Sequence, residues 1–310
     1  DGEINPIDKS IEIVKAIMSR WVLDVQYERQ ADFTAPEVFH HTRRANCLSF
    51  THLFVSLARA MDIRAHYVDV RFDEQITEND VIISNHHICA GVYDGAEFFL
   101  IDFDPQPQKN YRVYRLIDDL EAVANHYNNV AINEYAVHRE TLNDALVLLN
   151  IALKIKPDFL RALNNKGAIL ALMGQSDDAE VAYRKALSID PKMPEANANL
   201  AGLLLTRGKV HEAIPLSHRA VSESPQNEEY RYRLALAYLH LGNYELALKQ
   251  FRWIMRKDPG NVDALQGAAL AMYQLGDYEE AREHLQQILR TNPASEDARS
   301  LNALLMNKGY

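Results

Sequence analysis

Three residues have the types and predicted positions to do chemistry together, namely Cys47, His87 and Asp102. Asn46 is a good helix N-cap, and apolar residues follow it at helical spacing, so Cys47 falls in the first turn of a predicted helix. The unpaired N–H groups and the dipole at a helix N-terminus stabilise a thiolate, the nucleophilic form of cysteine. The alternative for Cys47 is a packing role, because it shares a helix face with two phenylalanines.

A predicted hairpin brings a histidine and an aspartate together downstream of that helix. Segments 82–93 and 96–103 have the composition of strands, and they flank Asp94-Gly95, a strong signal for a two-residue hairpin loop. Such a loop pairs Tyr93 with Ala96, and counting outward places His87 directly opposite Asp102. Opposed residues share a face with Cβ atoms roughly 4.5–5.5 Å apart, so the carboxylate would orient and charge-stabilise the imidazole.

The neighbouring His86 is predicted to lie on the other face of its strand, which also carries Ile88, Ala90 and Val92. That face suits a core and places His86 opposite Phe103, so His86 is expected to pack or to meet solvent. His87 is therefore the candidate base, in a chain order of nucleophile, base and orienting carboxylate. The pairing requires a strand without a bulge, because one extra residue would move His87 to the other face.

These segments resemble the transglutaminase-like superfamily of papain-like cysteine enzymes. The stretch RRANCLSFTHLFVSLARAMDIRAHYVDV is similar to its catalytic cysteine, helix and following strand, and HICAGVYDGAEFFLIDFDP is similar to its histidine and aspartate strands. The resemblance covers roughly residues 40–105. It implies an α+β papain-like domain over residues 1–125 with the catalytic triad Cys47, His87 and Asp102.

Two other chemistries could use the same residues. His87 and Cys89 lie two residues apart on one strand face and could join Cys47 as zinc ligands, but the usual paired spacings of zinc sites are absent. A disulfide between Cys47 and Cys89 would instead silence the site. No glycine-rich phosphate-binding motif occurs. We expect no metal and no cofactor.

The second half of the chain is dominated by a repeat of 34 residues. Proline, alanine and glycine each recur with this period. Proline stops one helix, alanine lets the helices approach closely, and glycine ends the other helix. The positions are Pro157, Pro191, Pro225, Pro259 and Pro293; Ala145, Ala179, Ala213, Ala247 and Ala281; and Gly174, Gly208, Gly242 and Gly276.

The repeat resembles the tetratricopeptide repeat (TPR), with Leu163, Gly167, Leu170, Gly174, Ala179, Tyr183, Ala186 and Pro191 at its signature positions. The resemblance implies an all-α, right-handed superhelix over residues 126–310. Within it we expect a degenerate first repeat at about 126–159, four full repeats at about 160–293 and a capping helix at 296–310.

The TPR resemblance also implies a polar concave face. Arginine and asparagine side chains there could hold the backbone or a carboxylate of an extended peptide, and the alternative is a solvated polar surface. The residues placed on this face are Arg161, Asn164, Asn165, Asn199, Tyr232, Arg233 and Gln266.

Composition and charge narrow the range of partners. Of 310 residues, 47% are hydrophobic and 25% are charged, with a formal net charge of −10, which argues against nucleic acid or anionic lipid as the main partner. No apolar run approaches the roughly 20 residues that cross a bilayer, so we expect no membrane-spanning segment. The chain starts at Asp1 without methionine, which fits an expression scar or a removed targeting segment upstream.

The function expected from these patterns is acyl transfer by Cys47, most simply as a protease or amidase whose protein or peptide substrate the TPR array recruits. The alternatives are a transglutaminase, in which an amine replaces water, and a non-catalytic TPR adaptor with a vestigial enzyme domain. A further alternative is that the TPR groove covers and regulates the catalytic cleft through residues 111–138. The sequence leaves substrate, compartment and oligomeric state open.

Overall fold

The protein is described from a computed structural model and divides into two compact units. The first unit consists of Asp1–Asn79 and Ile83–Gly174, and the second of Asp80–Ile82 and Gln175–Tyr310. The sequence-based division at residue 125 therefore falls inside the first unit. The structure describes residues 5–19, 26–27, 44–45, 47–71, 76–78, 81–83, 87–103, 113–132 and 142–306.

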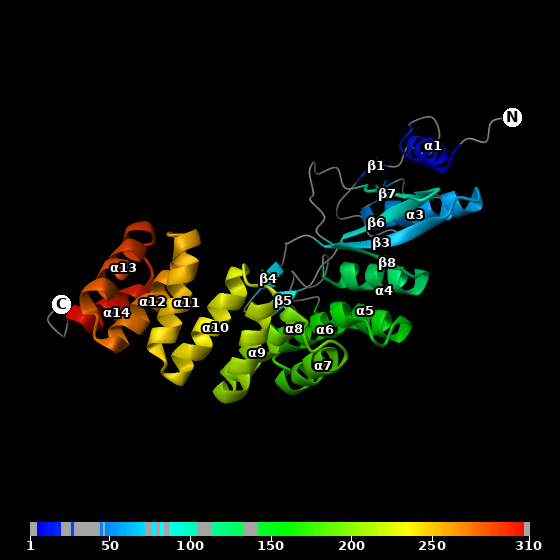
Figure 1. Cartoon of the computed structure of the whole chain (residues 1–310). Coiled ribbons are helices and arrows are strands. Elements are labelled where there is room, and N and C mark those ends of the chain that lie inside the picture. Colours follow the sequence, from blue (N-terminus) through cyan, green and yellow to red (C-terminus); the bar gives the residue numbers. More distant parts are fainter. Residues whose placement is uncertain are drawn as a thin grey trace. The chain divides into compact units, whose positions relative to one another are not determined.

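A four-stranded antiparallel sheet is the framework of the first unit (Figure 1). Its strand order is β7 (Glu97–Ile101), β6 (His87–Asp94), β3 (Ala65–Arg71) and β8 (Val113–Ile117). Two short pairs accompany it: β1 (Gln26–Tyr27) with β2 (Arg44–Ala45), and β4 (Ile76–Glu78) with β5 (Val81–Ile83). The sheet confirms that the chain forms strands on both sides of the predicted hairpin loop.

Two amphipathic helices supply the other half of the first unit's core. Helix α1 (Pro6–Met18) is capped by the Asn5 side chain and buries Ile13 and Ile17. Helix α3 (Cys47–Ala60) buries Phe50, Leu53 and Phe54 in the same hydrophobic cluster as Ile88, Ala90 and Val92 of β6. The face of β6 that carries Ile88, Ala90 and Val92 therefore packs in the core, as predicted.

The register of the β6–β7 hairpin differs from the prediction by two residues. Asp94 pairs with Glu97 and Tyr93 with Phe98, so the loop is Gly95-Ala96 rather than Asp94-Gly95. Gly95 has φ 60 and is the residue that needs a left-handed conformation, as at the first position of a type II′ turn. A shift of two keeps every side chain on its predicted face, but it makes the predicted direct pairing of His87 with Asp102 wrong.

A buried ion pair holds together the sheet and the helices that follow it. Arg161 of α6 (Leu160–Leu172) donates to both carboxylate oxygens of Asp69 on β3, at 3.0 and 2.9 Å, and both side chains are only 7% exposed. Arg161 also donates to Asn125 of α4 (Asp119–Val130). At the rim, Arg115 bonds Asp69, and Asn165 donates to Asn128 at 2.9 Å.

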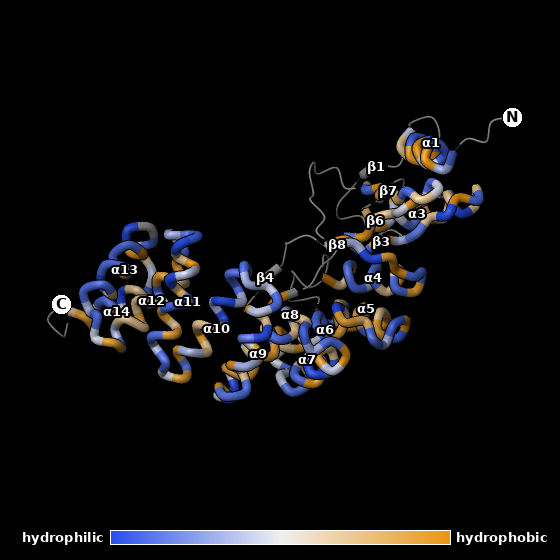
Figure 2. Tube along the Cα trace, in the orientation of Figure 1, coloured by the Kyte–Doolittle hydropathy of each residue, from blue (hydrophilic) through white to orange (hydrophobic). Residues whose placement is uncertain are grey.

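The repeat helices recur as predicted. Each glycine of the 34-residue period has a positive φ, between 72° and 91°, and all five periodic alanines are fully buried. Hydrophobic and hydrophilic residues alternate in short stretches along each helix (Figure 2). The helices are α5 (Leu142–Ile155), α6, α7 (Ser176–Ile189), α8 (Pro194–Thr206), α9 (Val210–Glu223), α10 (Glu228–Leu241), α11 (Tyr244–Lys257), α12 (Val262–Leu275), α13 (Tyr278–Thr291) and the terminal α14 (Glu296–Met306).

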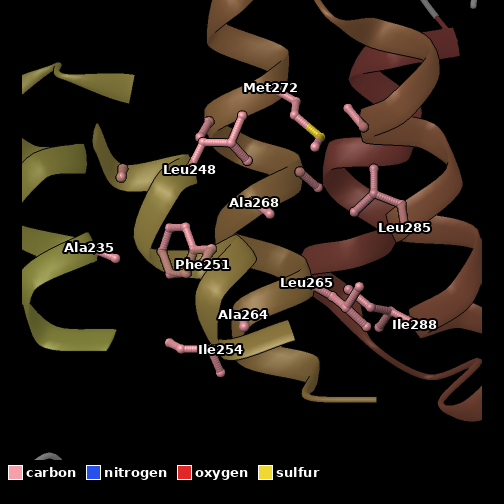
Figure 3. Packing of buried hydrophobic residues seen from close by; sticks show 14 of the residues in the cluster. Ala235, Leu248, Phe251, Ile254, Ala264, Leu265, Ala268, Met272, Leu285 and Ile288 are labelled. Atoms are coloured by element: carbon pink, nitrogen blue, oxygen red, sulfur yellow. The ribbon is translucent and has the colours of Figure 1, made fainter. Parts of the chain in front are cut away.

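Close helix packing in the second unit depends on small residues. Figure 3 shows Phe251 of α11 beside α12, with Ala264 and Ala268 in the same cluster. A Cβ atom on Gly267 would lie 2.3 Å from Cζ of Phe251, so only glycine allows this approach. Among the described residues, no helix is both long and apolar enough to cross a membrane.

We predict that Arg161→Met lowers the free energy of unfolding of the first unit by about 3–5 kcal/mol, because it leaves the Asp69 carboxylate buried without its main counter-charge. Chemical denaturation of the full chain measures the change. The matched control is Arg184→Met, which removes a half-exposed arginine paired with Glu180 and Glu212 and should cost about 0–1 kcal/mol. Equal losses in the two variants would contradict the prediction.

Candidate active site

The first predicted site residue, Cys47, begins a helix. Helix α3 starts at Cys47, the thiol is free, and the residue is half-buried rather than sealed in the core. Its backbone N–H is therefore among the first-turn groups that have no partner within the helix. The predicted cap, Asn46, lies outside the described residues. The expected position of the thiol at a helix N-terminus is confirmed.

His87 and Asp102 form a hydrogen-bonded pair at one end of the sheet. The distance between His87 Nε2 and Asp102 Oδ1 is 2.5 Å, and the two side chains are 3% and 19% exposed. His87 begins β6 and Asp102 directly follows β7, so the observed register makes them diagonal rather than directly opposed neighbours. Diagonal neighbours on one face remain within reach of a long side chain such as histidine.

The electrostatic surroundings of His87 favour its charged form. Burial lowers the pKa of His87, but hydrogen bonds to Asp102 and to Cys47, together with the charges of both groups, outweigh burial and raise it to about 9. The proton is thus favoured on the imidazole, between the carboxylate of Asp102 and the sulfur of Cys47. Such a setting suits a thiolate–imidazolium pair.

Thr51 ties the helix that carries Cys47 to the strand that carries His87. Its hydroxyl lies 2.8 Å from the carbonyl oxygen of Cys47 and 3.2 Å from that of Ile88, and it is fully buried. Ile88 is the residue after His87, so this one side chain fixes the first turn of α3 against the start of β6. Sequence reasoning missed Thr51, although its place one helical turn after Cys47 was a usable signal.

The second cysteine takes no part in this pair. Cys89 forms no disulfide and is fully buried, packed with Val68 and Val70 on the sheet face opposite the main core. Neither a disulfide nor a group of three or more potential metal ligands is found among the residues that the structure describes. The predicted neighbour of His87, His86, lies outside those residues.

Three of the seven residues predicted for the concave TPR face are buried in the first unit. Arg161 bonds Asp69, Asn165 bonds Asn128, and the Asn164 amide donates to Asn165 at 3.3 Å. These side chains contact the chain itself, because the segments that lie against α6 supply polar partners. They are therefore buried and not part of a solvated surface, and peptide binding by them stays a prediction.

The other four lie in the second unit. The Asn199 amide holds the backbone of residue 82. Tyr232 stacks edge-on against Phe251, with ring centroids 6.0 Å apart, and Gln266 donates to Asp297 of α14 at 3.2 Å. Arg233 is 4% exposed and donates to a glutamate one turn earlier. Peptide binding by these residues stays a prediction.

Comparison with protein families agrees with both halves of the sequence interpretation. Residues 2–105 match the model of the Transglutaminase-like superfamily, and residues 160–193 match that of the Tetratricopeptide repeat. Residues 208–288 match the model described as Anaphase-promoting complex, cyclosome, subunit 3. The chain thus has a transglutaminase-like domain at its N-terminus and TPR-type repeats after it. A search of curated proteins gave no significant match.

Solved structures similar to this chain show the fold of the repeat region. Pseudomonas aeruginosa pilF is 19% identical, with a TM-score of 0.55 over 61% of this chain and 86% of its own. A tetratricopeptide repeat protein from Parabacteroides merdae is 24% identical, with a TM-score of 0.51 over 59% and 72%. MamA from Desulfovibrio magneticus RS-1 is 21% identical, with a TM-score of 0.50 over 58% and 98%.

We predict that the His87 imidazole titrates with a midpoint near 9 and that Asp102→Asn lowers this midpoint, because the amide removes the carboxylate's charge. NMR of the ring protons measures the titration, assigned with His87→Gln. Since folding raises the pKa of His87 above 6.5, its stabilisation is complete below pH 6.5 and is lost as the pH rises through about 9. A midpoint at or below 6.5 in the parent protein would contradict this account.

We predict that Thr51→Val slows alkylation of Cys47 by iodoacetamide about tenfold, because the hydroxyl no longer fixes α3 against β6. The lost hydrogen bond should also lower the free energy of unfolding by about 1–2 kcal/mol. Ser56→Ala is the matched control, since Ser56 makes the same bond to the carbonyl one turn earlier, that of His52, on the exposed side of α3. Equal alkylation rates in the two variants would show that Thr51 does not position the thiol.

Proposed function

We propose that this protein is a cysteine-dependent acyl-transfer enzyme. In this proposal Cys47 is the nucleophile and His87 is the acid and base. Asp102 orients His87 and stabilises its positive charge. The observation that carries the proposal is the hydrogen-bonded pair of His87 and Asp102, 2.5 Å apart, with Cys47 at a helix N-terminus beside His87. Perturbed titratable groups of this kind concentrate at catalytic sites.

In the proposed reaction the thiol proton of Cys47 resides on His87, and Cys47 is the thiolate. The thiolate sulfur attacks the carbonyl carbon of an amide and forms a C–S bond, and the carbonyl electrons move to oxygen. The backbone N–H of Cys47 is one donor toward that oxyanion. When the oxyanion collapses, the C–N bond breaks, and the leaving amine takes the proton from His87.

The resulting thioester on Cys47 is cleaved by water. His87 removes a proton from the water, hydroxide adds to the thioester carbon, and the C–S bond breaks to give a carboxylic acid and regenerate the thiol. We favour water over an amine as acceptor because water is always available. With an amine the same steps form a new amide, which is the transglutaminase outcome.

The repeats suggest that the substrate or a partner is a protein or peptide. TPR-type helices present a continuous surface along the array, and an extended peptide can bind such a surface through backbone and side-chain contacts. Within the proposed function, the repeat region recruits the chain whose amide Cys47 attacks.

The test is the rate of Cys47 alkylation against pH, in Cys89→Ala and in the double variant Cys89→Ala/His87→Ala. We expect Cys47 of the first protein to be alkylated readily at about pH 6, and the double variant to lose that reactivity at least about tenfold. The reason is that the imidazolium stabilises the thiolate electrostatically.

The control is the same measurement after unfolding in denaturant, which should make the two proteins alike. If Cys47 is inert in the folded protein, or reacts at the same rate with and without His87, the catalytic proposal fails. The adaptor alternative would then be retained.

A further inference from the structure

The amide of Asn199 binds one residue of this chain by both of its backbone polar groups. Asn199 Oδ1 accepts from the N–H of Ile82 at 2.7 Å, and Asn199 Nδ2 donates to the carbonyl of Ile82 at 2.8 Å. One carboxamide therefore satisfies an extended residue in the way that a neighbouring strand would. This contact recognises an extended backbone and does not depend on which side chain the bound residue carries.

The side chain of Ile82 is buried among residues of the repeats. Ile82 is fully buried in a cluster with Ala198 of α8, Ala220 of α9 and Tyr230 of α10, and Val221 packs against it. Two alanines and a tyrosine leave room for a branched aliphatic group. A polar side chain buried there would be cut off from water. The pocket thus fits isoleucine or a side chain of similar size and shape.

The segment that fills this site comes from elsewhere in the sequence. Ile82 belongs to β5, which precedes α8 by more than a hundred residues, yet Asp80–Ile82 are part of the second compact unit. The two hydrogen bonds join residues 117 positions apart (Figure 1, β5 and α8). A short extended segment, held through its backbone and one buried side chain, is how a bound peptide is held.

We propose that the repeat array carries a peptide-binding site formed by Asn199 and the pocket of Ala198, Ala220 and Tyr230, specific for an extended segment with a branched aliphatic residue, which this chain fills with its own Ile82. An outside protein partner binds there only by presenting such a segment and displacing the internal one. The internal segment is tethered, so its effective concentration at the site is high and it competes strongly. The inference is independent of the chemistry proposed for Cys47.

The test uses a fluorescent synthetic peptide with the sequence of residues 76–86, and its binding is followed by anisotropy. The full-length parent protein should bind it weakly, because the site is filled. Ile82→Asp places a carboxylate in the apolar pocket and should empty the site, so that this variant binds the peptide at least about tenfold more tightly than the parent. Adding Asn199→Ala to the variant should abolish the gain.

Two controls separate the proposal from general effects of the substitution. Ile189→Asp adds a carboxylate at an exposed isoleucine of the same unit and should leave binding at the level of the parent. A peptide carrying aspartate at the position of Ile82 should not bind to any variant. This second control changes only the probe, so the folding of the protein does not affect it.

Equal binding to the parent, to Ile82→Asp and to Ile189→Asp would overturn the proposal, as would binding that Asn199→Ala leaves intact. If Ile82→Asp does not fold, amide hydrogen exchange decides instead. The N–H of Ile82 should be protected in the parent and lose that protection at least about tenfold in Asn199→Ala, with the helices of the repeats unchanged. An Ile82 amide that is unprotected in the parent, or unaffected by Asn199→Ala, would also overturn the proposal.

Discussion

A buried imidazolium is stable only when negative charge lies beside it, and the candidate site is built around this requirement. Asp102 supplies the carboxylate at 2.5 Å, and the β6–β7 hairpin brings the end of one strand back to the start of the other. Helix α3 must then present Cys47 to the same imidazole, which requires the helix to start at that residue and to be fixed against β6. Thr51 fixes it. The sheet, the helix start and the buried hydroxyl serve one electrostatic arrangement.

Local patterns of the sequence were sufficient for the elements of this arrangement. The helix start at Cys47 follows from local apolar spacing, and the periodic glycines adopt the left-handed conformation that their position after a helix predicts. The hairpin was also predictable, but its register was not. Asp94 can remain in a strand, whereas Gly95 readily takes a positive φ, and the loop therefore centres one residue later than the Asp-Gly signal indicates.

Contacts between distant segments were beyond the sequence patterns. The repeat period correctly groups Arg161, Asn165 and Asn199 with the polar positions of the first helix in each repeat, but periodicity does not show what those side chains meet. Arg161 is hydrogen-bonded to Asp69, Asn165 to Asn128, and Asn199 to the backbone of Ile82. A buried arginine or asparagine needs a partner of matching geometry, so these polar residues select the segments of the chain that pack against them.

The central claim is that His87 makes Cys47 an acyl acceptor, and reaction with an activated acetyl ester tests it most directly. The Cys89→Ala protein and its His87→Ala counterpart are mixed with the ester, quenched in acid and analysed by mass spectrometry for acetyl thioester at Cys47. The account predicts rapid acetylation of Cys47, followed by hydrolysis, only where His87 is present. Acetylation at the same rate in both proteins, or none at Cys47 in either, would contradict it.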